Sequence, residues 1–140
     1  MFKAIITTLF LILVTGSQTL FASTPPPPPT TPGETPKLYL KLEPPLVVNV
    51  DEGDVMRFLQ VDAQLQYGQP LAQPIIEKHM PAIRDAMIML LSGQSVTEIK
   101  TPQGKEHLRE TTLQAIQQVM TEATGETVVD AVYFTGFVIQ

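Results

Sequence analysis

Two histidines and a few carboxylates are the residues with the clearest chemical potential. His79 and His107 are the only imidazole groups of the chain, so histidine-based catalysis or metal binding would depend on them. A metal ion would also need a third ligand, such as Glu77, Asp85 or Glu106. The two histidines belong to different predicted helices. This separation argues against a metal site. It favours His79 as a helix-surface residue or as one bonded to a neighbouring backbone group.

The common motifs of catalysis and cofactor binding are absent from the sequence. It contains no G-x-S-x-G nucleophile elbow, no H-E-x-x-H zinc motif and no G-x-G-x-x-G dinucleotide loop. It contains no cysteine, which excludes a zinc ribbon, a disulfide scaffold and a thiol nucleophile. The segment 101–105 ends in Gly-Lys but lacks the first glycine of a phosphate loop, so it indicates a capped helix start. We therefore predict no catalytic, cofactor-binding or metal-binding residues.

The composition limits the class of partner. A chain of 140 residues can form one domain with short additional segments. The formal net charge of −5 argues against a nucleic-acid partner, because a nucleic-acid surface needs clustered Lys and Arg. Charged residues make up 16% of the chain, against about 25% in an average soluble domain.

Residues 1–22 have the pattern of a signal peptide or a membrane anchor. After Lys3, the uncharged run from Ala4 to Val14 has the length of a signal-peptide core, and cleavage can follow Ala22. The segment is also long enough for a retained anchor, because a spanning helix needs about 17–20 residues. Both alternatives remain open, and both send the rest of the chain across a membrane. Residues 23–36 contain seven prolines and predict an extended polyproline linker.

The folded domain is predicted at 37–140 and begins with strands. Leucines alternate with other residues from Leu38 to Leu42, and Pro44-Pro45 interrupts the pattern before a second strand at 46–50. Residues 55–67 alternate between an apolar and a polar face, which indicates a half-buried strand. Residues 128–140 are apolar on both faces, so we expect a central strand covered on both sides, by helices or by another subunit.

Apolar residues spaced three and four positions apart predict two amphipathic helices. The first covers 74–91, with an expected kink or restart at Pro81 and a left-handed cap at Gly93. Ser95 begins a capping-box pattern. The second helix begins with Thr101 as cap and ends at Gly125. Its apolar stripe contains Leu108, Thr112, Ala115, Ile116, Val119, Met120 and Ala123.

The order of elements predicts an α+β fold: a small antiparallel or mixed sheet with two amphipathic helices packed on it. The first helix should bury a stripe formed by Ile76, Met80, Ile83, Met87, Leu90 and Leu91.

Several segments resemble one known family, the flagellar basal body-associated FliL proteins. Three patterns carry most of the resemblance: H-x-P-x-I-R-[DN] at 79–85, G-K-x-x-L-R at 104–109 and V-Y-F-T-x-F-V-x-Q at 132–140. Further similarity lies at Tyr39, at 44–49 and at 57–61, so the resemblance covers nearly the whole predicted domain.

The resemblance implies a bacterial inner-membrane protein whose periplasmic domain is similar to the stomatin/prohibitin (SPFH) type. It implies a non-enzymatic accessory of the flagellar basal body, without cofactors, that associates with the stator proteins and forms a homo-oligomeric ring. Such a protein supports flagellar rotation, swimming, swarming and chemotaxis. The alternative is a free periplasmic binding module that is released when the signal peptide is cleaved. A short set of residues is the candidate interface with other subunits or with the stator: Met80, Arg84, Asp85, Met87 and Arg109.

Overall fold

The computed structural model describes residues 36–140. The predicted signal peptide or anchor at 1–22 lies outside the described residues, and so does the linker except for Pro36. The described part has the predicted α+β class, with a small antiparallel sheet and several helices. In chain order its elements are β1 (Leu38–Lys41), β2 (Leu46–Glu52), β3 (Val55–Tyr67), α1 (Ala72–Lys78), α2 (Met80–Ser92), α3 (Val96–Ile99), α4 (Pro102–Thr124) and β4 (Ala131–Ile139).

Strand β3 is the centre of the sheet. Its 13 residues pair with β4 along one side, while β1 and β2 share the other side. Pro44-Pro45 separates β1 from β2, because proline has no N–H to donate to a neighbouring strand. Two short strands therefore replace one long strand beside β3.

Strand β4 is an outer strand of the sheet in the described chain, so the prediction of a central strand at 128–140 is wrong, while cover by another subunit stays a prediction. Within residues 36–140 it pairs only with β3. A register shift leaves Thr135 without a partner, and such a bulge moves the following side chains to the opposite face. As a result, apolar residues on both sides of the bulge pair with buried residues of β3: Val132, Phe134, Phe137 and Ile139. The bulge therefore accounts for much of the pattern that indicated two covered faces.

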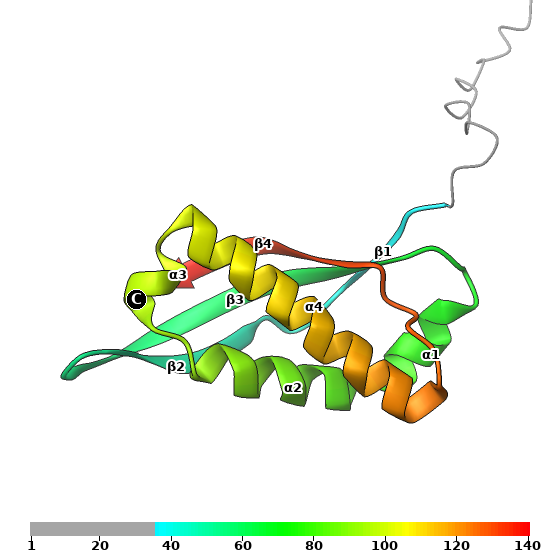
Figure 1. Cartoon of the computed structure of the whole chain (residues 1–140), viewed down its shortest axis with the longest axis horizontal. Coiled ribbons are helices and arrows are strands. Elements are labelled where there is room, and N and C mark those ends of the chain that lie inside the picture. Colours follow the sequence, from blue (N-terminus) through cyan, green and yellow to red (C-terminus); the bar gives the residue numbers. More distant parts are fainter. Residues whose placement is uncertain (1–35) are drawn as a thin grey trace, which may run out of the picture. The chain divides into compact units, whose positions relative to one another are not determined.

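Helices α2 and α4 lie side by side on one face of the sheet, as Figure 1 shows. The predicted stripe of the first helix is confirmed, because four of its side chains are fully buried and Met80 and Leu90 are half-buried. On α4 the buried residues are Leu108, Thr112, Ile116 and Met120, whereas Ala123 is exposed. The opposite face of the sheet carries no helix from the described part of the chain.

The helix boundaries near the prolines follow the sequence. The expected break at Pro81 is confirmed: α1 ends at Lys78, and α2 restarts at Met80 with Pro81 in its first turn. Thr101 is the cap of α4, since its hydroxyl accepts a hydrogen bond from the Gly104 N–H at 2.9 Å. Gly125 ends α4 in the left-handed conformation, with φ of 83°.

Gly93 and Ser95 are helix caps at the predicted positions, but the predicted cap geometry is wrong at both. Gly93 has φ of −85° and needs no left-handed conformation, because the Gln94 side chain donates to the Leu90 carbonyl at 2.9 Å. At Ser95 the side chain makes no capping hydrogen bond. Its backbone carbonyl instead accepts from the Glu98 N–H at 3.1 Å. In both places a local hydrogen bond replaces the predicted one.

Replacement of Thr101 by alanine should lower the free energy of unfolding by about 1 kcal/mol, because the Gly104 N–H loses its capping oxygen. Urea unfolding followed by circular dichroism measures this change. Thr121→Ala is the matched control, since Thr121 is exposed in the last turn of the same helix and its side chain caps nothing at the start. The control should stay within about 0.5 kcal/mol of the wild type. Equal stabilities for the two variants would remove the capping role of Thr101.

Candidate interaction surfaces

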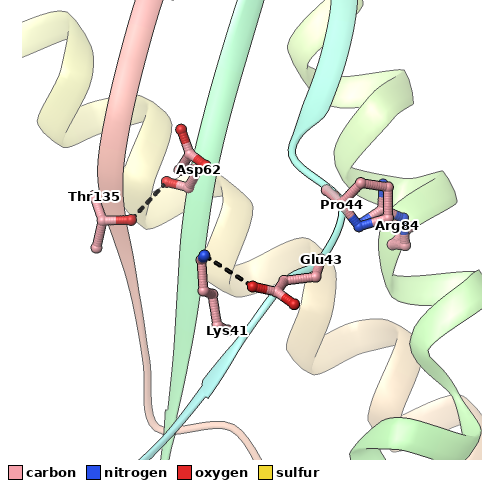
Figure 2. A network of polar contacts seen from close by, with 6 residues as sticks. All are labelled: Lys41, Glu43, Pro44, Asp62, Arg84 and Thr135. Atoms are coloured by element: carbon pink, nitrogen blue, oxygen red, sulfur yellow. Dashed lines mark hydrogen bonds and ion pairs between the residues drawn. The ribbon is translucent and has the colours of Figure 1, made fainter.

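Arg84 connects helix α2 to the link between β1 and β2. Its guanidinium donates a hydrogen bond to the Pro44 carbonyl at 2.7 Å, and Figure 2 shows the two side chains next to each other. The carbonyl accepts from a charged donor, which makes a stronger bond than a neutral one. Arg84 therefore has a structural contact within the domain.

Two further polar contacts lie near Pro44, one beside the end of β1 and one between β3 and β4. Lys41 and Glu43 form an ion pair at 2.8 Å, and the Thr135 hydroxyl donates to the Asp62 carbonyl at 3.4 Å (Figure 2). The hydrogen bond from Lys41 lowers the pKa of Glu43, and the same bond raises the pKa of Lys41. Both charged side chains are exposed, so the pair is a surface feature with little weight in stability.

The remaining candidates on α2 differ in exposure. Asp85 is exposed and takes part in no ion pair within residues 36–140. Met80 is half-buried and packs against the core. Met87 is 0% exposed and belongs to the core, so its assignment to an interface is wrong for the folded domain. Asp85 is thus the α2 candidate with the most freedom to meet another protein.

Arg109 lies on α4, apart from the α2 candidates. It pairs with Glu106 one turn earlier, and its Nε donates to a Glu106 oxygen at 3.0 Å. This hydrogen bond lowers the pKa of Glu106 and raises that of Arg109. Arg84 reaches the β1–β2 link on one side of β3, whereas Arg109 lines a groove against β4 on the other. The predicted residues therefore mark two surfaces.

A groove between the start of α4 and strand β4 was not predicted from the sequence. It has a volume of about 350 Å³. The Phe134 and Phe137 rings lie 6.0 Å apart within it, and the Lys105 ammonium is 5.1 Å from the centre of the Phe137 ring. Such a distance allows a cation–π interaction. The full lining is Pro102, Lys105, Glu106, Arg109, Tyr133, Phe134 and Phe137.

The face of the sheet opposite the helices exposes several apolar side chains. Val47 and Val138 flank Gln60 on neighbouring strands and are 59% and 49% exposed. Phe58 follows on the same face of β3 with 53% exposure. Tyr39 and Tyr133 form a tilted ring pair at 6.1 Å. Grouped apolar side chains of this kind often mark protein contacts.

Comparison with known proteins identifies the family. The sequence model of the flagellar basal body-associated protein FliL matches residues 39–140. This chain belongs to the FliL family. It is also 34% identical over 100 residues to the flagellar protein FliL of Aquifex aeolicus (strain VF5), an alignment that covers 71% of this chain. The aligned region spans 60% of the length of the Aquifex protein.

The FliL-like segments have clear structural roles in this domain. At 79–85, Pro81 lies in the first turn of α2, Ile83 is fully buried and Arg84 donates to the Pro44 carbonyl. At 104–109, a Cβ atom on Gly104 would lie 1.9 Å from the Glu98 carbonyl oxygen, so only glycine fits. The segment 132–140 includes β4 with its bulge. The segments that indicated the family from sequence thus set the positions of α2, α4 and β4.

The described part of this FliL domain shows no metal centre. Residues 36–140 contain no group of three or more His, Asp or Glu side chains placed to hold a metal ion. His79 precedes α2, Asp85 lies on α2 and Glu106 lies on α4. Of three cavities in the described residues, none is lined by all three of these side chains. The same residues include no helix that is long and apolar enough to span a membrane.

Proposed function

We propose that this FliL-family chain is a non-enzymatic accessory of the flagellar motor that associates with the stator proteins and supports rotation, swimming, swarming and chemotaxis. The match of residues 39–140 to the FliL family is the single observation that carries this proposal. The signal-like or anchor-like pattern at 1–22 supports a place on the periplasmic side of the inner membrane, at the basal body.

The proposal includes a homo-oligomeric ring of stomatin/prohibitin-like domains. A closed ring uses two different surfaces on each subunit, one for each neighbour. This domain offers two separate sets of candidate residues, with Arg84, Asp85 and Met80 on α2 and Arg109 on α4 beside β4. The exposed apolar face of the sheet adds surface for contact with a subunit or the stator.

Charge reversal at Asp85 tests the ring interface without disturbing the fold. Asp85→Arg should weaken association between subunits about tenfold, because a like charge replaces an opposite one across the contact. Amine-reactive cross-linking of the full chain in membranes gives the readout, and arginine adds no reactive amine. Arg84 suits this test less, because its replacement also removes the hydrogen bond to Pro44.

Glu122→Arg makes an equal charge change at an exposed position near the end of α4, away from Arg109, and serves as the control. Both variants should unfold within about 0.5 kcal/mol of the wild type, since surface substitutions rarely have larger effects. Asp85→Arg should show fewer cross-linked species and slower swimming, and Glu122→Arg should show neither. A wild-type ladder and normal swimming with Asp85→Arg would remove Asp85 from the interface.

The alternative is a free periplasmic binding module, favoured by the cleavage site after Ala22. The intact mass of the exported protein distinguishes the free module from the membrane-anchored accessory. A chain that retains residues 1–22 and fractionates with the membrane supports the anchored accessory. A chain that begins at Ser23 in the soluble fraction supports the free module.

A further inference from the structure

Strand β4 leaves one backbone edge open in the described part of the chain. Phe58 and Gln140 exchange two backbone hydrogen bonds of 2.8 and 2.9 Å, so the backbone groups of Ile139 point away from β3 by antiparallel alternation. The sequence of β4 contains no charged residue and no proline. Proteins commonly use such residues to protect an edge from another strand. The opposite edge does contain them, at Lys41, Glu43 and Pro44.

The groove beside α4 lies along this open edge. Phe134 and Phe137 are half-buried residues of β4, and they form the apolar floor where Pro102 and Lys105 begin α4. A strand added to β4 would direct every second side chain into this groove. An edge strand next to a side-chain groove is the arrangement that binds extended peptides by strand addition.

The charges at the groove favour an acidic partner. Arg109 is already compensated by Glu106. Lys105 forms no ion pair within residues 36–140, and its ammonium lies 5.1 Å from the centre of the Phe137 ring. A carboxylate at this place would supply the missing counter-charge in a partly apolar setting, where a charge-assisted hydrogen bond is strong.

We propose that this groove binds an extended segment of another protein, added as a strand to β4, with an apolar residue two positions before an acidic one. The apolar side chain packs on Phe134 and Phe137, and the carboxylate meets Lys105. Residues two apart on a strand are separated by roughly 6.5–7 Å. The Lys105 ammonium lies 5.1 Å from the centre of the Phe137 ring, so it is close to the apolar contact on the same side of the added strand. The proposal stands without a ring or stator binding, and it assigns the surface beside Arg109 to this segment and not to a neighbouring subunit.

A labelled synthetic peptide tests the proposal with the full chain in detergent. The probe is fluorescein-Thr-Val-Thr-Leu-Thr-Asp-Thr-Val-amide, which places Leu and Asp on one face of a strand. A second peptide carries Lys in place of Asp. Fluorescence anisotropy should give saturable binding of the Asp peptide and about tenfold weaker binding of the Lys peptide. Equal affinities, or no binding of either peptide, would overturn the proposal.

Reversal of the charge at Lys105 should reverse this preference. Lys105→Glu should bind the Lys peptide better than the Asp peptide, whereas Lys78→Glu, an equal change on α1, should keep the wild-type preference. Position 105 is exposed and lies in the first turns of α4, where a negative charge suits the helix dipole, so the variant should fold. A wild-type preference in Lys105→Glu would place the acidic contact elsewhere and contradict the assignment.

N-methylation of the peptide tests strand addition itself. In a strand, alternate N–H groups point toward the neighbouring strand, so methylation of one alternate set should abolish binding and methylation of the other should not. An equal effect of both sets would exclude strand addition. If unlabelled full chain displaces the peptide at the concentrations where it self-associates, the occupant is a second copy and the assignment to another protein is overturned.

Discussion

The Ile83→Asp variant is expected to lose its folded structure at neutral pH. Ile83 is 0% exposed and lies in the core under α2. An aspartate there would be an unpaired charge among apolar side chains, at a cost of several kcal/mol. Domains of this size are stable by only about 5–15 kcal/mol, so such a cost removes most of the margin. Circular dichroism and urea unfolding of the full chain measure the loss.

The pH dependence of this variant has a definite sign. Burial raises the pKa of a carboxyl group above its ordinary value of about 4. The charged form is then penalised only in the folded state, so Ile83→Asp should regain part of its stability as the pH falls toward that value. Ile83→Val is the control and should lose only about 1 kcal/mol. Cooperative unfolding of Ile83→Asp within about 1 kcal/mol of the wild type would contradict the assignment of α2 to the core.

The Gly104→Ala variant is expected to be destabilised by about 2–3 kcal/mol. Helix propensity alone predicts the opposite sign, because alanine is better than glycine in a helix by about 1 kcal/mol. In this structure, however, an added Cβ would lie 1.9 Å from the Glu98 carbonyl oxygen and 2.6 Å from its carbon. Backbone atoms cannot move away cheaply, so α3 and α4 would have to separate.

Gly93→Ala is the matched control for this clash. A Cβ at Gly93 would meet nothing closer than 3.8 Å, and the residue has an ordinary φ of −85°. This variant should be as stable as the wild type or up to about 1 kcal/mol more stable. Urea midpoints for the two variants give the comparison. Equal stability of Gly104→Ala and Gly93→Ala would show that the close approach of Glu98 does not exist in solution.

The helices and strand β3 could be predicted from the sequence, because the pattern of apolar residues along each of them determines which face is buried. The stripe that includes Ile76, Ile83 and Leu91 is buried as expected, since a single apolar face decides how a helix packs. The alternation along β3 gave the correct buried face from Leu59 to Tyr67. Thr101 and Gly125 were also correct, because their caps depend on residues that are adjacent in sequence.

The wrong or missed predictions concern places where contacts between residues far apart in the sequence, or competing local contacts, determine the structure. The bulge at Thr135 shifts the alternation of β4, and a pattern read residue by residue cannot show such a shift. Methionine suits surfaces that adapt to a partner, and this property suggested an interface role for Met87. The side chain belongs instead to the apolar stripe of α2 that is buried in the core. The groove at Lys105 and Phe137 was missed because its two sides lie far apart in the sequence and meet only after folding.

Localisation of the untagged full chain in cells tests the central claim, a motor accessory at the basal body, most directly. Immunofluorescence with a second label on the flagellar hooks shows whether the chain lies at flagellar bases, and a stator-deletion strain shows whether that position depends on the stator. We predict foci at the bases in the wild type and weaker or absent foci without the stator. A uniform distribution around the periplasm in wild-type cells would contradict the claim.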